Sequence, residues 1–207
     1  MPHATRPSYF RSLSSSSQKD KPRLYIGLYP RCSGHDGCDA YHWTLVTGPA
    51  TPARKDITTR HHLAHTGSHT VLGNDSQHSL YHGDDLIDRP HAQAELLVRI
   101  TVAKVVDNER LQTVLQNLRV RSRVGNDCTE PSTCAQWVKD AFVALRADSS
   151  CLKSLLDIED WDVIERMARE YCRGKRREGR FSNDAMDWWR RENVSTFNAW
   201  ENRETTV

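Results

Sequence analysis

Apolar and polar positions follow a strand pattern in three runs of the chain. The runs 23–29 (RLYIGLY) and 41–47 (YHWTLVT) alternate, are rich in β-forming residues and stop at Pro30 and Gly48. They predict an antiparallel hairpin with a loop of about ten residues. The run 96–105 (LLVRITVAKV) is almost continuously apolar and β-branched, which is typical of a central strand.

Three later segments show helical spacing. Asp107 is placed to cap one helix, Pro131 with Ser132 and Thr133 begins another, and a third starts near Asp160. Their expected buried faces, in that order, are Leu111, Val114, Leu115 and Leu118; Trp137, Val138, Ala141, Phe142 and Leu145; and Trp161, Ile164, Met167, Ala168 and Tyr171.

The remaining segments lack a sustained period. Residues 1–21 are typical of a disordered arm, and residues 52–91 are polar and His-rich, with one short strand expected near 60–63. Residues 182–207 form a charged tail that contains tryptophan. The pattern therefore predicts one α+β domain over residues 22–181, in which a small antiparallel sheet packs on helices.

Composition limits the class of protein. Of 207 residues, 37% are hydrophobic and 27% are charged, and the net charge of +2 implies neither a nucleic-acid nor a membrane partner by itself. No run approaches the ~20 apolar residues of a membrane span, and the first residues lack the apolar centre of a secretory signal. We expect a cytoplasmic protein whose six cysteines are reduced. The scarcity of acids in the first twenty residues leaves a mitochondrial presequence as an alternative.

Cys134 is the residue best placed for chemistry. It lies in the first turn of the helix that begins at Pro131, where the positive end of the helix dipole favours a nucleophilic thiolate. His42 is the candidate base, and His62 is the candidate to orient that base. Free cysteine is also among the most buried residue types, and a histidine on an apolar strand is commonly structural. A core role for Cys134 and His42 is therefore the competing interpretation.

Three more residues near this pair are candidates to bind substrate. Trp43 follows the candidate base, and Gln136 and Asp140 lie within two turns of the sulfur, where they are placed to offer hydrogen bonds around an oxyanion.

A metal site is the main alternative for the histidines. His61, His62, His65 and His69 fall close together, after Cys32 and Cys38. Zinc sites use two close ligand pairs of standard spacing, which this arrangement lacks. We expect no metal or other cofactor, and whether the His-rich region 61–91 binds a metal stays open.

The run 166–180 is strongly basic, with seven Lys or Arg against two acids. Arginine suits phosphate because its fork of donors matches phosphate geometry. Arg173, Arg176 and Arg177 are therefore the expected nucleic-acid-binding residues. A solvated helix face is the alternative.

The order LYIGLY, YHWTLVTGP, RHHL, LLVRITVAKVVDNERLQTVLQNLRV, C-x2-WVKDAFVAL, DWDVIERMAREY and GRF resembles a widespread fungal family of small uncharacterised proteins. The likeness is collinear over about residues 23–181. The family's Tyr-His-Trp falls on residues 41–43 and its second histidine on His62. Its usual Asn-Cys is Thr133-Cys134 here, which puts one local hydrogen bond in doubt.

That family is in turn similar to circularly permuted NlpC-type papain-like enzymes, such as lecithin:retinol acyltransferase, in which His-bearing strands precede the Cys-bearing helix. The resemblance implies that Cys134 is the nucleophile, His42 the base and His62 the orienting residue.

The chain also resembles the arginine-containing cyclodipeptide synthases of fungal secondary metabolism. These enzymes condense arginine, taken from arginyl-tRNA, with a second amino acid. This likeness implies an aminoacyl-tRNA donor, a small amino acid or amine acceptor, and carboxylates that recognise arginine, for which the candidates are Asp84, Asp85, Asp88 and Glu95.

These observations lead to a thiol-dependent acyl or aminoacyl transferase as the first hypothesis. A cysteine amidase or hydrolase of the same fold is the second hypothesis. A non-enzymatic binding module, in which Cys134 is a core residue, is the third.

Overall fold

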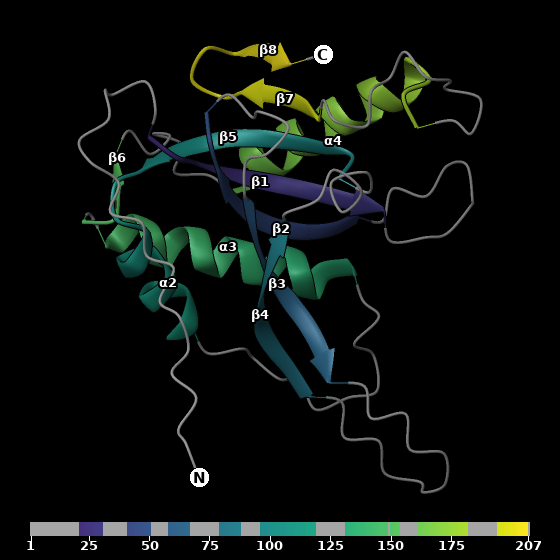
Figure 1. The fold of residues 1–207 in the computed structure, drawn as a ribbon. Helices are drawn as coiled ribbons and strands as arrows, with labels where there is room; N and C mark the ends of the chain where they lie inside the picture. Colours follow the sequence, from purple (N-terminus) through teal and green to yellow (C-terminus); the bar gives the residue numbers. More distant parts are fainter. Residues whose placement is uncertain are drawn as a thin grey trace, which may run out of the picture.

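The computed structural model describes residues 21–30, 41–50, 58–66, 79–87, 96–118, 131–148, 150–153, 161–181 and 194–206. Its centre is a mixed, mostly antiparallel sheet with strand order β4-β3-β2-β1-β5-β7-β8, and the short β6 pairs with the end of β5 (Figure 1). The strands are β1 (Arg23–Pro30), β2 (Tyr41–Gly48), β3 (Thr58–Thr66), β4 (Ser79–Ile87), β5 (Val98–Val105), β6 (Leu152–Lys153), β7 (Ser195–Asn198) and β8 (Arg203–Thr206).

Three described helices pack on one face of this sheet. They are α2 (Asn108–Gln116), α3 (Pro131–Ala147) and α4 (Trp161–Arg177). Alternate strand residues join the apolar faces of these helices in one core, which includes Ile26, Trp43, Ile100, Val138 and Ile164. Asp107 caps α2 by accepting a hydrogen bond from the N–H of Arg110. The expected Asp107 cap is confirmed, as are the expected buried faces of the three helices.

The second face of the sheet is also buried, and it is more polar. The residues that alternate with the core set include Tyr25, Thr44, Arg99, Thr101 and Thr196, each no more than 6% exposed. A buried polar face must satisfy its hydrogen bonds or bind something that does. This face is therefore a candidate for binding as well as for packing.

The β3–β4 hairpin leaves the rest of the sheet at one end. β3 pairs with β2 over three positions only, from His61 opposite Leu45 to Thr59 opposite Thr47. In contrast, β3 and β4 pair along their whole length, from Thr58 opposite Ile87 to Thr66 opposite Ser79. In Figure 1 the hairpin runs past α3 and away from β1 and β5. Consequently the first half of β2 has no β3 partner along the described residues of the two strands, and another group is needed at its edge.

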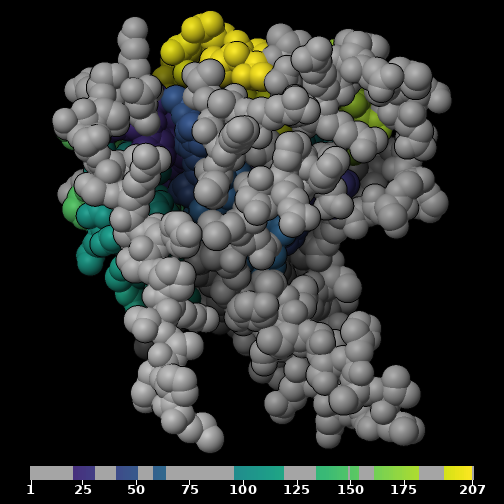
Figure 2. Space-filling model, viewed as in Figure 1, coloured from purple at the N-terminus to yellow at the C-terminus, as the bar shows by residue number. Residues whose placement is uncertain are grey.

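The C-terminal hairpin completes the other side of the sheet. β7 runs parallel to β5, with Arg99 opposite Thr196, and β8 pairs antiparallel with β7. The hairpin lies at the molecular surface (yellow in Figure 2). Glu204 on β8 ties it to α4, because this carboxylate accepts hydrogen bonds from the Tyr171 hydroxyl and from the ammonium of Lys175.

The α+β class, the β1–β2 hairpin and the central position of β5 are confirmed. The sheet is larger than expected and is mixed. The strand expected near 60–63 extends over residues 58–66, and β4 was not expected in the polar region 52–91. Part of the expected tail 182–207 forms β7 and β8. The expected arm at residues 1–21 lies outside the described residues except for Lys21.

Candidate functional site

The sulfur of Cys134 lies at the edge of β2 that β3 leaves unpaired. The backbone N–H of Trp43 donates a hydrogen bond to Sγ at 3.4 Å, and the thiol donates to the carbonyl oxygen of Tyr41 at 3.7 Å. Backbone hydrogen bonds of a strand point sideways, toward the neighbouring strand. The sulfur therefore occupies the level of the sheet itself, where a backbone group of β3 would otherwise lie, and the side chain is only 4% exposed.

His42 lies between the two backbone groups that hold the sulfur. Strand alternation directs its side chain to the face opposite the rings of Tyr41 and Trp43. There its Nε2 lies 3.4 Å from Nδ1 of His62, and the two rings meet edge to face with centroids 5.5 Å apart. One imidazole must donate and the other accept, so each ring fixes the tautomer of its partner. Both histidines are half-buried.

The structure thus brings the imidazoles of His42 and His62 together, and it places the Cys134 sulfur against the backbone of the two residues that flank His42. His62 lies on the strand next to His42, and Cys134 contacts the backbone on both sides of His42. Their chemical roles remain predictions.

His61, the neighbour of His62 on β3, lies in the protein core. His61 is completely buried on the helix-covered face, where its Nε2 lies 3.3 Å from the hydroxyl of Thr47. Adjacent His61 and His62 therefore point to opposite faces of the sheet. Among the residues that the structure describes, no group of three or more His, Cys, Asp or Glu is placed to hold a metal ion. Cys32, Cys38 and His69 lie outside that set.

The three expected substrate-binding residues have different surroundings. Trp43 is completely buried, with its ring centroid 6.0 Å from that of Trp161. Gln136 is exposed, and its amide donates to the carboxylate of Asp140 at 2.8 Å. These two side chains thus bond to each other on the outer part of α3, while the Cys134 side chain turns inward. The structure does not gather the three around the sulfur.

The basic face of α4 reaches the strand that carries His42. The guanidinium carbon of Arg169 lies 5.3 Å from the centre of the Trp43 ring and 6.0 Å from that of Tyr41, and the guanidinium of Arg176 lies 5.9 Å from the Tyr41 ring. Arg173 and Arg177 are exposed, whereas Arg176 is half-buried. Sequence reasoning missed Arg169. Arg169 precedes Arg176 by seven residues, which is close to two helical turns, so the two lie on the same face of a helix. This spacing could have identified Arg169 from the sequence.

Of the acidic residues expected to recognise arginine, Asp84 and Asp85 lie on β4, in register with His61 and Arg60. Asp88 and Glu95 lie outside the described residues.

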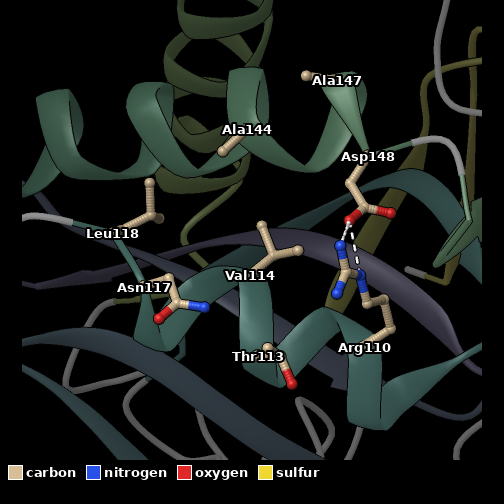
Figure 3. Close-up of a pocket in the computed structure, with 8 residues that line it drawn as sticks. All are labelled: Arg110, Thr113, Val114, Asn117, Leu118, Ala144, Ala147 and Asp148. Carbon is tan, nitrogen blue, oxygen red and sulfur yellow. Dashed lines mark hydrogen bonds and ion pairs between the residues drawn. The ribbon is translucent and has the colours of Figure 1, made fainter.

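A surface pocket of about 460 Å³ lies between α2 and the second half of α3 (Figure 3). Val114 and Ala144 face each other inside it, and the ion pair between Arg110 and Asp148 spans one end at 2.7 Å. Ala144 is ten residues from Cys134, which is about 15 Å along a helix. The pocket is therefore separate from the thiol.

No helix in the described part of the chain is both long and apolar enough to cross a membrane.

Comparison with known proteins gives a family but no function. No curated protein and no solved structure matches the chain significantly. One family model, described as a family of unknown function (DUF6914), matches residues 21–206. This range includes every described strand and helix, among them β7 and β8 beyond the expected domain end at residue 181. The chain therefore belongs to this family of unknown function, DUF6914.

Proposed function

We propose that this protein is a thiol-dependent acyltransferase in which Cys134 is the nucleophile, His42 the base and His62 the residue that orients the base. The observation that carries the proposal is the position of the Cys134 sulfur against Tyr41 and Trp43, the two neighbours of His42. A thiol, a base and a second imidazole bonded to that base are the parts that nucleophilic catalysis by cysteine requires.

The proposed reaction has two steps. The imidazole of His42 takes the proton of Cys134, and the thiolate attacks the carbonyl carbon of an acyl ester. A C–S bond forms, the ester C–O bond breaks, and the leaving oxygen takes the proton back from His42. An amine then attacks the thioester, a C–N bond forms, and the C–S bond breaks. The amine proton passes through His42 to the departing sulfur.

Backbone N–H groups in the first turn of α3 favour this chemistry. The first four N–H groups of a helix have no intrahelical partner, and Cys134 lies in the first turn of α3. The oxyanion that forms when a thiolate attacks a carbonyl is stabilised by such donors. A permuted papain-like core is the corresponding proposal for the fold, because it too brings His-bearing strands to the start of a Cys-bearing helix.

The specific form of the proposal is aminoacyl transfer from arginyl-tRNA to the amine of a second amino acid that is itself held as an ester, such as a second aminoacyl-tRNA. The arginine amine then attacks that ester, a second C–N bond forms as the ester C–O bond breaks, and the cyclic dipeptide is released. The arginines of α4 favour this form, because Arg169 and Arg176 lie against the rings of Tyr41 and Trp43, beside the thiol. Arg173 and Arg177 project from the same helix and are accessible to phosphates.

Hydrolysis by the same thiol is the second candidate, since water in place of the amine gives a free acid. The observation in its favour is that the catalytic parts are the same for both reactions.

Detection of the acyl-enzyme tests the proposal. The protein is incubated with an activated ester or with arginyl-tRNA, without an amine, and the peptide containing Cys134 is analysed by mass spectrometry. We expect one acyl group on Cys134 that disappears when amine is added. The variant Cys134→Ala should carry none, and the control Cys151→Ala, which removes another buried free thiol, should behave as the wild type. Steady release of free acid without amine would favour the hydrolase, and no acylation by any donor would favour the binding module.

A further inference from the structure

Arg99 is a buried cation on the sheet face opposite the helices. It lies on the central strand β5, between Gly27 of β1 and Thr196 of β7, and only 3% of the residue is exposed. Its Nε donates to the Thr196 hydroxyl at 2.7 Å. Its guanidinium carbon lies 4.6 Å from the centre of the Tyr25 ring.

The described residues around Arg99 do not neutralise its charge. Within the described ranges no carboxylate forms an ion pair with Arg99, and no residue accepts a hydrogen bond from its two terminal nitrogens, Nη1 and Nη2. Burial lowers its pKa, and the groups that oppose this effect are the phenols of Tyr25 and Tyr171. Burying a cation costs several kcal/mol. Stacking on a desolvated aromatic ring returns only about 2 kcal/mol, so the residues that the structure describes do not supply a counter-charge.

The surroundings hold the guanidinium in a fixed orientation. The Thr196 hydroxyl donates to the carbonyl oxygen of Val194 at 2.8 Å, which leaves its lone pairs to accept from Nε of Arg99. With Nε held, the planar fork formed by Nη1 and Nη2 is fixed as well. Thr101, two residues along β5 and on the same face, is also buried and pairs with Tyr25 across the β1–β5 ladder.

We propose that Arg99 and Thr101 bind an oxyanion, the carboxylate or phosphate group of a small ligand. Two parallel N–H···O bonds from the fork match either group, and they strengthen when water is excluded. The ligand supplies the charge that the described part of the fold does not.

This oxyanion site is distinct from the thiol site. In the row across the sheet, Gly27 lies between Arg99 and Thr44. A Cβ on Gly27 would lie 2.8 Å from the Thr44 hydroxyl oxygen and 3.0 Å from Leu96 Cδ1, so these side chains already fill the space on that side. The guanidinium of Arg99 lies over the Tyr25 ring, whereas His42 pairs with Tyr29 at the opposite end of β1. The proposal therefore does not depend on the function of Cys134.

Thermal unfolding of the full chain in different anions tests the proposal. Inorganic phosphate or sodium acetate is titrated at pH 7, with sodium chloride holding the ionic strength constant. A ligand of the folded state raises the midpoint in a saturable way. We expect such a rise with phosphate, acetate or both, compared with chloride alone. A response to phosphate alone identifies a phosphate ligand, and a response to acetate alone identifies a carboxylate.

Variants show whether the response belongs to Arg99. Arg99→Lys keeps the charge but loses the fork, so the apparent affinity should fall at least about tenfold, and Thr101→Val should reduce it less. Arg110→Gln, on the separate helix α2, and Cys134→Ala should respond as the wild type does. Equal midpoints in the three anions for the wild type, or an unchanged response in Arg99→Lys, would overturn the proposal and leave Arg99 as a partner of the Tyr25 ring.

Discussion

The backbone N–H of Trp43 donates to the sulfur of Cys134 across 3.4 Å, although 91 positions separate the two residues. The bond joins the first turn of α3 to the strand edge that β3 leaves unpaired. The sulfur therefore has two roles that mutations can distinguish. It accepts a hydrogen bond from a buried N–H group, and it is the proposed nucleophile.

Substitution of Cys134 should separate these properties. Cys134→Ala leaves the Trp43 N–H without an acceptor and opens a small cavity, so we expect a loss of about 1–3 kcal/mol in the free energy of unfolding. Cys134→Ser retains an acceptor and should lose less, yet it should form no thioester. Urea unfolding measures stability, and mass spectrometry measures acylation. A serine variant as active as the wild type would contradict the assignment of the nucleophile.

The reactivity of Cys134 should depend on His42. If His42 takes the thiol proton, iodoacetamide should label Cys134 faster than the buried thiols of Cys151 and Cys172. The rate at Cys134 should fall in His42→Ala, whereas His61→Ala serves as a control that changes a neighbouring imidazole bonded to Thr47. Peptide mapping after timed labelling gives the three rates. Labelling of all three thiols only at the rate of unfolding would mean that Cys134 is an inert core residue.

Glu204 should contribute to the attachment of β8. It accepts hydrogen bonds from Tyr171 and from Lys175, whose side chain is 4% exposed and whose ammonium also bonds to Glu178 at 2.8 Å. Burial lowers the pKa of Lys175, but the two carboxylates outweigh burial and leave it raised. Glu204→Gln should therefore cost about 1–3 kcal/mol.

The comparison variant for Glu204 is Lys175→Met. It removes the buried cation together with its need for a partner, so it should change stability less than Glu204→Gln does. Equal urea midpoints for Glu204→Gln and the wild type would show that the hairpin is held by its backbone pairing alone.

The basic face of α4 should govern tRNA binding if the aminoacyl form of the proposal holds. Neutralising Arg173, Arg176 and Arg177 together removes up to three phosphate contacts, so the slope of log affinity against log salt should become shallower by about 2–3. Arg176 also lies over Tyr41, so Arg176→Gln alone should cost about 0.5–1 kcal/mol of stability.

Filter binding at several salt concentrations gives the slope. Arg110→Gln combined with Arg203→Gln, at exposed arginines of α2 and β8, is the control for general loss of charge. Acylation by a small activated ester should survive in the triple variant. If tRNA binding is unchanged, the run is a solvated helix face and the hydrolase becomes the better candidate.

Most helices and the first strands could be predicted because their patterns are local. Asp107 caps α2, and the spacing of Trp161, Ile164 and Ala168 marks the buried face of α4. The sequence of β4, SLYHGDDLI, includes Gly83, Asp84 and Asp85, which have low strand propensity. Pairing with β3 along its whole length outweighs that propensity, and no local pattern records such pairing.

The candidate site was predictable only in part. The local sequence pattern predicts that Cys134 lies at the start of a helix and that His42 lies on a strand. The edge position of the sulfur depends on where β3 separates from β2, and the contact between Arg169 and Trp43 depends on how α4 crosses the sheet. Arg99 interrupts the apolar run 96–105, but no local pattern shows that it is buried, because its burial is a property of the assembled face.

The parallel pairing of β7 with β5 has a consequence for synthesis on the ribosome. Arg99 and Thr196 pair across the sheet, and β5 is central only when β7 lies beside it. Until that segment has left the exit tunnel, β5 presents an open edge of apolar residues, which favours pairing between nascent chains. Chains released early, after α4 but before Ser195, should therefore aggregate and depend on chaperones.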